Sequence, residues 1–118
     1  MTRLKGQTHE QRKNKIFLVD DDALFLKSLE IDFLENGDFI IETYPTGELC
    51  MANLSHDPDV IILEYFLDGI DATAMNGIDT LDKIKAFNQD ILVVMGISNY
   101  SALQSSSSTV NILFTITQ

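Results

Sequence analysis

Acidic residues follow two of the apolar runs in this sequence, at positions where carboxylates could bind a cation. Residues 16–19 lead directly into three aspartates at 20–22, and residues 60–63 lead into Glu64. Short continuous apolar runs are typical of strands buried on both faces of a parallel sheet. The functional crevice of such a sheet lies at the carboxyl ends of its strands, so we expect these acids to meet there. Crowded carboxylates need a cation, and hard oxygen ligands in a partly hydrated site suit Mg²⁺.

The run of aspartates also begins an amphipathic helix. Asp22 is placed to cap its N-terminus, and Asn36 followed by Gly37 provides the stop signal. The apolar residues that recur at helical spacing are Leu24, Phe25, Leu29, Phe33 and Leu34. We therefore interpret Asp22 as a helix cap rather than as a ligand.

The rest of the chain alternates strands with helices. We expect further strands at 39–43, 60–63 and 91–97, helices at 46–53 and 78–87, and a fifth strand at 112–117. This alternation predicts an α/β fold, a doubly wound parallel sheet with helices on both faces and right-handed crossovers. Residues 96–98, at the end of the fourth strand, then join the acids as candidate site residues.

Length and charge limit the classes of protein that this sequence can represent. The 118 residues suit one globular domain, and the net charge is −10. The first 15 residues carry +4, so the remainder carries −14, which repels phosphate backbones and disfavours nucleic-acid binding by the body of the chain. We divide the chain into a basic polar tail at 1–14 and a single domain at 15–118.

Cys50 is the only cysteine, which excludes an intramolecular disulfide, and we expect it to be a buried, inert thiol. The sequence has no apolar run long enough for a membrane span and no signal-peptide core, so we expect a cytoplasmic protein without membrane contact.

The sequence resembles the receiver domain of two-component response regulators over roughly residues 15–97. The residues that carry the resemblance are 15–22 (KIFLVDDD), 58–67 (PDVIILEYFL), Asn76-Gly77 at a helix start, and the strand at 91–95. The resemblance implies a flavodoxin-like fold with strand order 2-1-3-4-5. It also implies that Asp20 and Asp21 hold Mg²⁺, and that Glu64 occupies the phosphoacceptor position as a further ligand. The partners implied are a histidine kinase or histidine phosphotransfer protein, which donates the phosphoryl group, and a downstream protein that reads the switched surface.

Several departures from the family pattern argue against efficient phosphorylation. Glu64 stands where the family has aspartate, and its extra methylene displaces the nucleophile. Strict register places Ile97 where the family has serine or threonine, so the switch candidate, Ser98, comes one residue late and on the opposite face. No lysine follows Lys85, so the cation that pairs with phosphate in the family is absent. The loop from 67 to 76 is also longer than the family pattern, and no room remains after 112–117 for a last helix.

The C-terminal quarter has a composition unlike the rest. No charged residue follows Asp90, and four serines occupy 105–108. Two explanations stay open: a natural degenerate end, or an altered reading of an ordinary receiver's last third. The uncharged, β-prone stretch at 111–118 predicts aggregation or oligomerisation through this segment.

Two other classes of protein fit parts of the sequence. A phosphatase of the haloacid-dehalogenase type would use Asp20 as nucleophile and Asp22 as acid/base, with Ser98 on the phosphate, but it too requires a late lysine. A flavodoxin-like cofactor binder would need Ser, Thr and Gly donors after the first strand, where this chain has three acids. We therefore expect a signalling module rather than an enzyme, with its output through another protein.

Overall fold

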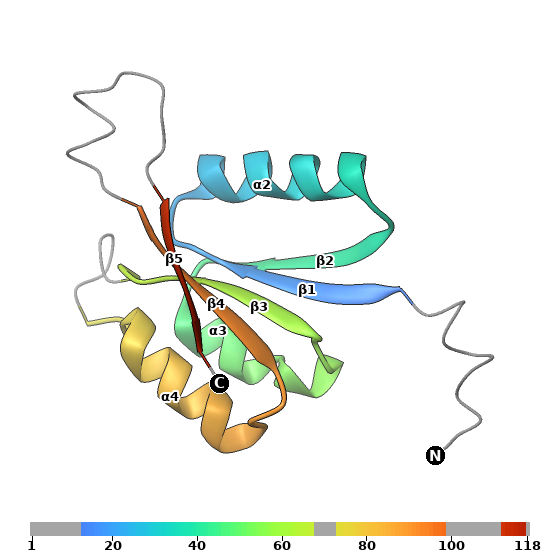
Figure 1. Cartoon of the computed structure of the whole chain (residues 1–118). Coiled ribbons are helices and arrows are strands. Elements are labelled where there is room, and N and C mark those ends of the chain that lie inside the picture. Colours follow the sequence, from blue (N-terminus) through green and yellow to red (C-terminus); the bar gives the residue numbers. More distant parts are fainter. Residues whose placement is uncertain (1–12, 68–72, 99–111, 118) are drawn as a thin grey trace, which may run out of the picture.

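The fold was analysed in a computed structural model, which describes residues 13–67, 73–98 and 112–117. A five-stranded sheet forms its centre (Figure 1), in the order β2-β1-β3-β4-β5. The strands are β1 (Asn14–Val19), β2 (Phe39–Tyr44), β3 (Val60–Glu64), β4 (Leu92–Ser98) and β5 (Ile112–Thr117). The first four strands pair in parallel. The predicted α/β fold and the strand order are thus confirmed.

The direction of β5 corrects the expectation of a wholly parallel sheet, because β5 pairs antiparallel with β4. A parallel strand requires a crossover of a dozen or more residues, usually a helix that packs on the sheet. The linking sequence, residues 99–111, is rich in serine and lacks the apolar periodicity of such a helix. An antiparallel return needs no crossover and satisfies the backbone of β4 equally well.

The helices cover the two faces of the sheet unequally (Figure 1). Helix α2 (Ala23–Asn36) lies on one face, whereas α3 (Gly47–Ala52) and α4 (Gly77–Phe87) lie on the other. The short 3₁₀ helix η1 (Leu54–His56) follows α3 in the chain. Asp22 caps α2 as predicted, because its side chain accepts hydrogen bonds from the backbone amides of Leu24 and Phe25, each at 3.1 Å.

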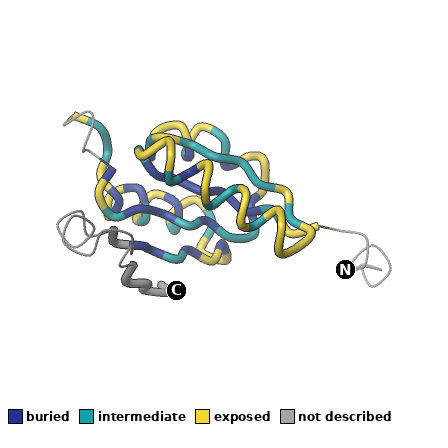
Figure 2. The backbone as a smooth tube through the Cα atoms, turned by 90° about the horizontal axis from the view of Figure 1, so that it is seen from above, coloured by how far each residue is buried: buried dark blue, intermediate teal, exposed yellow. Residues whose placement is uncertain are grey.

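The apolar core has two parts, separated by the sheet. The larger part lies on the side of α3 and α4 and includes Phe17, Ile61 and Val93. The smaller part lies under α2 and centres on Ile16, Leu18 and Leu26. Most of the buried residues belong to the inner strands β1, β3 and β4. Figure 2 shows the buried backbone in the interior of the molecule and the exposed backbone toward its outside. Cys50 is buried in the larger part, and burial raises the pKa of its thiol to about 12, as expected for an inert cysteine.

Two of the apolar residues assigned to the buried stripe of α2 lie in solvent instead. Leu24 is 84% exposed and Leu34 is 51% exposed, while Leu26 is the residue that α2 buries fully. Helical spacing cannot separate the two faces here because apolar residues occur on both of them. The exposure of these apolar residues on the outer side of α2 was therefore not predicted from the sequence.

Candidate acidic site at the strand ends

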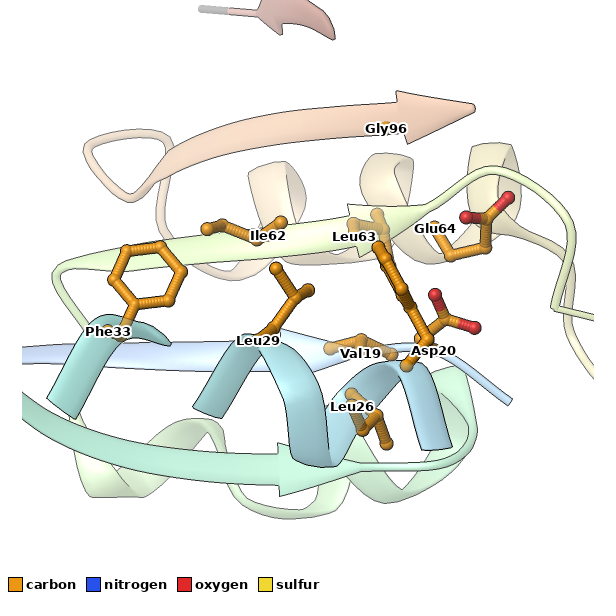
Figure 3. Close-up of a pocket in the computed structure, with 10 residues that line it drawn as sticks. Val19, Asp20, Leu26, Leu29, Phe33, Ile62, Leu63, Glu64 and Gly96 are labelled. Carbon is orange, nitrogen blue, oxygen red and sulfur yellow. The ribbon is translucent and has the colours of Figure 1, made fainter. Parts of the chain in front are cut away.

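The carboxyl ends of β1 and β3 bring two acids together. Val19 pairs with Leu63 in the parallel register. The next residues, Asp20 and Glu64, therefore lie next to each other at the carboxyl ends of the two strands. Both are buried, with 5% exposure for Asp20 and 6% for Glu64. Figure 3 shows their carboxylates at the same end of a pocket between α2 and the sheet. The predicted meeting of the two acidic stretches is thus present in the structure.

Asp20 lies in surroundings that disfavour its charge. Burial raises its pKa to about 7, and the nearby acidic groups of Glu64, Asp21 and Asp22 add to this effect. The backbone amide of Asp22 donates to Oδ1 of Asp20 at 2.9 Å and partly opposes the rise. A buried carboxyl beside like charges is the kind of group that a divalent cation would stabilise in its ionised form.

Glu64 is held by the backbone that follows it. Its Oε2 accepts a hydrogen bond from the amide of Phe66 at 3.1 Å. The first residue of α4, Gly77, donates its amide to the carbonyl of Tyr65 at 3.1 Å. A Cβ at Gly77 would lie 2.6 Å from the carbonyl oxygens of both Glu64 and Tyr65, so the close approach of α4 to this strand end requires glycine. Sequence reasoning used Gly77 only as a helix start and missed this role.

The other two aspartates occupy the rim. Asp21 is half-buried next to Asp20, and Asp22 is exposed and serves α2 as its cap. Within the described ranges, no group of three or more His, Cys, Asp or Glu side chains is arranged to hold a metal ion. The donors nevertheless fit Mg²⁺ in kind, because they are all carboxylate oxygens and Asp20 and Glu64 form a buried pair of like groups. Asp20 and Glu64 are the two acids that would hold the ion, with Asp21 beside them on the rim.

The end of β3 lies beside Gly96 of β4. Glu64 pairs with Gly96, and the amide of Tyr65 donates to the carbonyl of Gly96 at 2.8 Å. The position beside the acid therefore has no side chain. Ile97 and Ser98 follow Gly96 in β4, and their side chains lie outside the described part of the structure. The expected displacement of Ser98 by one residue therefore stays a prediction.

The last lysine of the sequence does not serve this site. Lys85 donates from Nζ to the carbonyl oxygens of Gln89 at 3.2 Å and Ile91 at 2.7 Å. Ile91 immediately precedes β4, so Lys85 ties α4 to the amino end of that strand, whereas the acids lie at carboxyl ends. No lysine follows Lys85 in the printed sequence, so Lys85 is the last one whose position can be compared with the site.

Comparisons with known proteins agree with this architecture. No family model and no curated protein matches the chain. Among solved structures, the N-terminal domain of a response regulator receiver protein from Methanoculleus marisnigri JR1 is 30% identical, with a TM-score of 0.57 over 69% of this chain and 63% of that one. The signal receiver domain of a putative LuxO repressor from Vibrio parahaemolyticus is 20% identical, with a TM-score of 0.61 over 81% of this chain and 72% of that one.

A chain of the CheX–CheY–BeF₃–Mg²⁺ complex from Borrelia burgdorferi is 24% identical, with a TM-score of 0.61 over 77% of this chain and 68% of that one. Some similar structures are much longer, since the chain spans only 20% of NtrX from Brucella abortus. The matches show that the chain has the fold of response regulator receiver domains. Within the described residues, no helix is long and apolar enough to cross a membrane.

Proposed function

We propose that the chain is a receiver module of a two-component phosphorelay that signals by binding other proteins and is not itself an enzyme. The observation that carries this proposal is the buried pair Asp20 and Glu64, at the ends of adjacent parallel strands in a receiver fold. Its partners are a histidine kinase or histidine phosphotransfer protein and a downstream protein. The module acts in the cytoplasm.

The proposed cofactor is Mg²⁺, bound weakly by Asp20, Asp21 and Glu64. Mg²⁺ typically takes one or two carboxylates and fills its octahedron with water and phosphate oxygens. When bound, the ion would neutralise charge on a transferred phosphoryl group. Asp20 and Glu64 then supply ligand oxygens, and the amide of Phe66 keeps the Glu64 carboxylate turned toward its own strand end.

Phosphorylation of this module is proposed to be impaired. In-line transfer needs a nucleophile at the position that the metal defines, and the longer side chain of Glu64 changes that position. Gly96 offers no hydroxyl beside the acid, and Lys85 binds the other end of the sheet. The module therefore retains the acidic site, and among the described residues neither Gly96 nor Lys85 would read a phosphoryl group there.

The phosphatase alternative has less support. It requires the Asp22 carboxyl as an acid/base, but that carboxyl accepts two backbone amides as the cap of α2. A group committed to a helix cap is poorly placed to exchange protons with a substrate.

A Mg²⁺ titration followed by backbone amide shifts tests the proposed site. In the wild type, we expect shifts concentrated at residues 20–22 and 64–66. The double variant Asp20→Asn/Asp21→Asn should lose them, while the control Asp82→Asn/Asp90→Asn, which changes the net charge equally at exposed positions, should keep them. A wild-type response in the first variant would refute the assignment.

A further inference from the structure

Asparagine is followed by glycine at two places in this chain, and the two pairs lie in different surroundings. They are Asn36-Gly37, at the end of α2, and Asn76-Gly77, at the start of α4. The side-chain amide of an asparagine can be attacked by the backbone nitrogen of the next residue. Glycine permits this attack most readily, because it has no Cβ to hinder the approach and it adopts the widest range of backbone angles. Both pairs are therefore chemically capable of deamidation.

Both reacting groups of the pair at the start of α4 are held by hydrogen bonds. The side chain of Asn76 caps the helix, because its Oδ1 accepts a hydrogen bond from the amide of Asp79 at 2.8 Å. The amide of Gly77, which would be the attacking group, donates to the carbonyl of Tyr65 at 3.1 Å. Gly77 is also buried. The start of α4 must therefore open before these two groups can react.

The pair at the end of α2 is much less restrained. Asn36 and Gly37 are both exposed. Gly37 is fully extended, with φ −177° and ψ 179°, and its amide donates no hydrogen bond to any residue that the structure describes. The side chain of Asn36 donates from Nδ2 to the carbonyl of Asp32 at 2.7 Å, within the last turn of the helix. Opening of this one turn is enough to free the side-chain amide.

Charge weakens the last turn of α2. The C-terminus of a helix carries a partial negative charge, which basic residues stabilise and acidic residues destabilise. The last turn of α2 has no basic residue, whereas Asp32, Glu35 and Asp38 lie in it or close to it. Asp38 forms an ion pair with Lys13 at 3.3 Å, but its side chain is 83% exposed, so the pair contributes little. We therefore expect this end of α2 to open more often than the start of α4.

We propose that Asn36 is a site of spontaneous deamidation and that the fold protects Asn76. The backbone nitrogen of Gly37 attacks Cγ of Asn36 and closes a five-membered succinimide ring. The side-chain nitrogen leaves with the proton of the attacking nitrogen as ammonia. Water then opens the ring at one of its two carbonyl carbons, giving either aspartate or isoaspartate, in which the backbone runs through the side-chain methylene. The reaction requires only water, and this inference goes beyond the proposed signalling function.

Either product changes the link between α2 and β2. An ionised acid at position 36 cannot donate to the carbonyl of Asp32, and it adds negative charge to the end of the helix that least tolerates it. Isoaspartate also lengthens the backbone shortly before Phe39, whose ring packs against Phe33 of α2 with centroids 5.7 Å apart. We expect the deamidated protein to unfold at a lower denaturant concentration, whereas the acidic site, at the other end of α2, stays intact.

The test is peptide mapping by mass spectrometry after the full chain has been incubated in mildly alkaline buffer. Conversion of amide to acid is measured at Asn36 and Asn76 in the same sample, so each asparagine is the control for the other. We expect Asn36 to convert at least about tenfold faster, because Asn76 reacts only after the start of α4 has opened. Methyl transfer by an isoaspartyl methyltransferase identifies the isoaspartate product.

A second incubation in guanidinium chloride removes the fold and shows whether the structure causes the difference. In the unfolded chain, the rate at Asn76 should rise to approach the rate at Asn36. Gly37→Ala should slow the reaction at Asn36 and leave Asn76 unchanged, because the added Cβ hinders the attacking nitrogen. Equal rates in the folded chain, a difference that persists in guanidinium chloride, or conversion of Asn36 only after unfolding would each overturn the proposal.

Discussion

Glu64 lies in register with Gly96 across the β3–β4 pair, so the acid at the end of β3 has a neighbour without a side chain. The resemblance to receiver domains implies a hydroxyl at the end of the fourth strand, where Ile97 and Ser98 follow Gly96 in this chain. It also implies aspartate at the position of Glu64, whose side chain is one methylene longer. Under the proposed function, the acids bind Mg²⁺ and both departures impair switching.

Asp20→Asn should stabilise the metal-free protein above neutral pH. The pKa of Asp20 is raised from 3.8 to about 7, so between these values the folded state binds a proton that the unfolded state has released. The contribution of Asp20 to stability therefore falls as pH rises through this window. We expect the variant to gain about 2–4 kcal/mol in free energy of unfolding at about pH 8, and almost nothing below pH 4.

Urea unfolding in a metal chelator, at a series of pH values, measures this difference. Asp90→Asn removes an exposed charge and is the control. A difference between wild type and Asp20→Asn that did not change with pH would contradict the burial argument.

Gly77→Ala should damage the site through the backbone. The added Cβ meets the carbonyl oxygens of Glu64 and Tyr65, which cannot move without displacing the end of β3. We expect a loss of about 1–3 kcal/mol in stability and a weaker Mg²⁺ response. Gly37→Ala is a useful comparison because its Cβ meets only ring atoms of the Phe39 side chain, which can rotate away. Thermal melts of both variants should show the larger loss for Gly77→Ala; equal losses would argue against the close approach.

Glu42→Gln should reduce stability at neutral pH but matter little in acid. The Glu42 carboxylate accepts a hydrogen bond from the Tyr44 hydroxyl and contacts Nδ1 of His56 at 2.7 Å, with Lys15 Nζ 3.7 Å away. Burial alone would raise the pKa of Glu42, but these partners outweigh it and lower the pKa below 4.5. The stabilisation is therefore present above pH 4.5 and is lost as pH falls through the lowered pKa.

We expect a loss of about 1 kcal/mol for Glu42→Gln near pH 7, because the amide retains one acceptor but not the charge. Denaturant midpoints near pH 7 and pH 3 measure it. Wild type and variant should converge at the lower value, and a constant gap would indicate that the carboxylate charge contributes nothing.

The sequence predicts those features that depend on local pattern. The apolar runs before Asp20 and Glu64 identify strands buried on both faces, and parallel strands necessarily bring their carboxyl ends to one edge. The cap at Asp22 follows from residue type and position. The fold and the acidic pair could therefore be predicted from the sequence alone.

Other features depend on long-range packing and could not be predicted. The pairing of Glu64 with Gly96 depends on how β3 and β4 align with each other, which the residue types of the two strands do not determine. The direction of β5 depends on whether the linking sequence at 99–111 can form a crossover helix that packs on the sheet. The apolar residues Leu24 and Leu34 follow helical spacing as well as the buried ones do, and only the position of α2 over β1 and β2 leaves them in solvent.

The most direct test of the central claim is treatment with acetyl phosphate and Mg²⁺, followed by intact mass and backbone amide shifts, for wild type and Glu64→Asp. The account predicts no stable phosphoryl adduct on the wild type. In Glu64→Asp it predicts that any shifts stay near residues 20–22 and 64–66, because Gly96 has no side chain beside the acid and Lys85 is bound at the other end of the sheet. A stable adduct on the wild type, or large shifts that spread along β4 in Glu64→Asp, would contradict it.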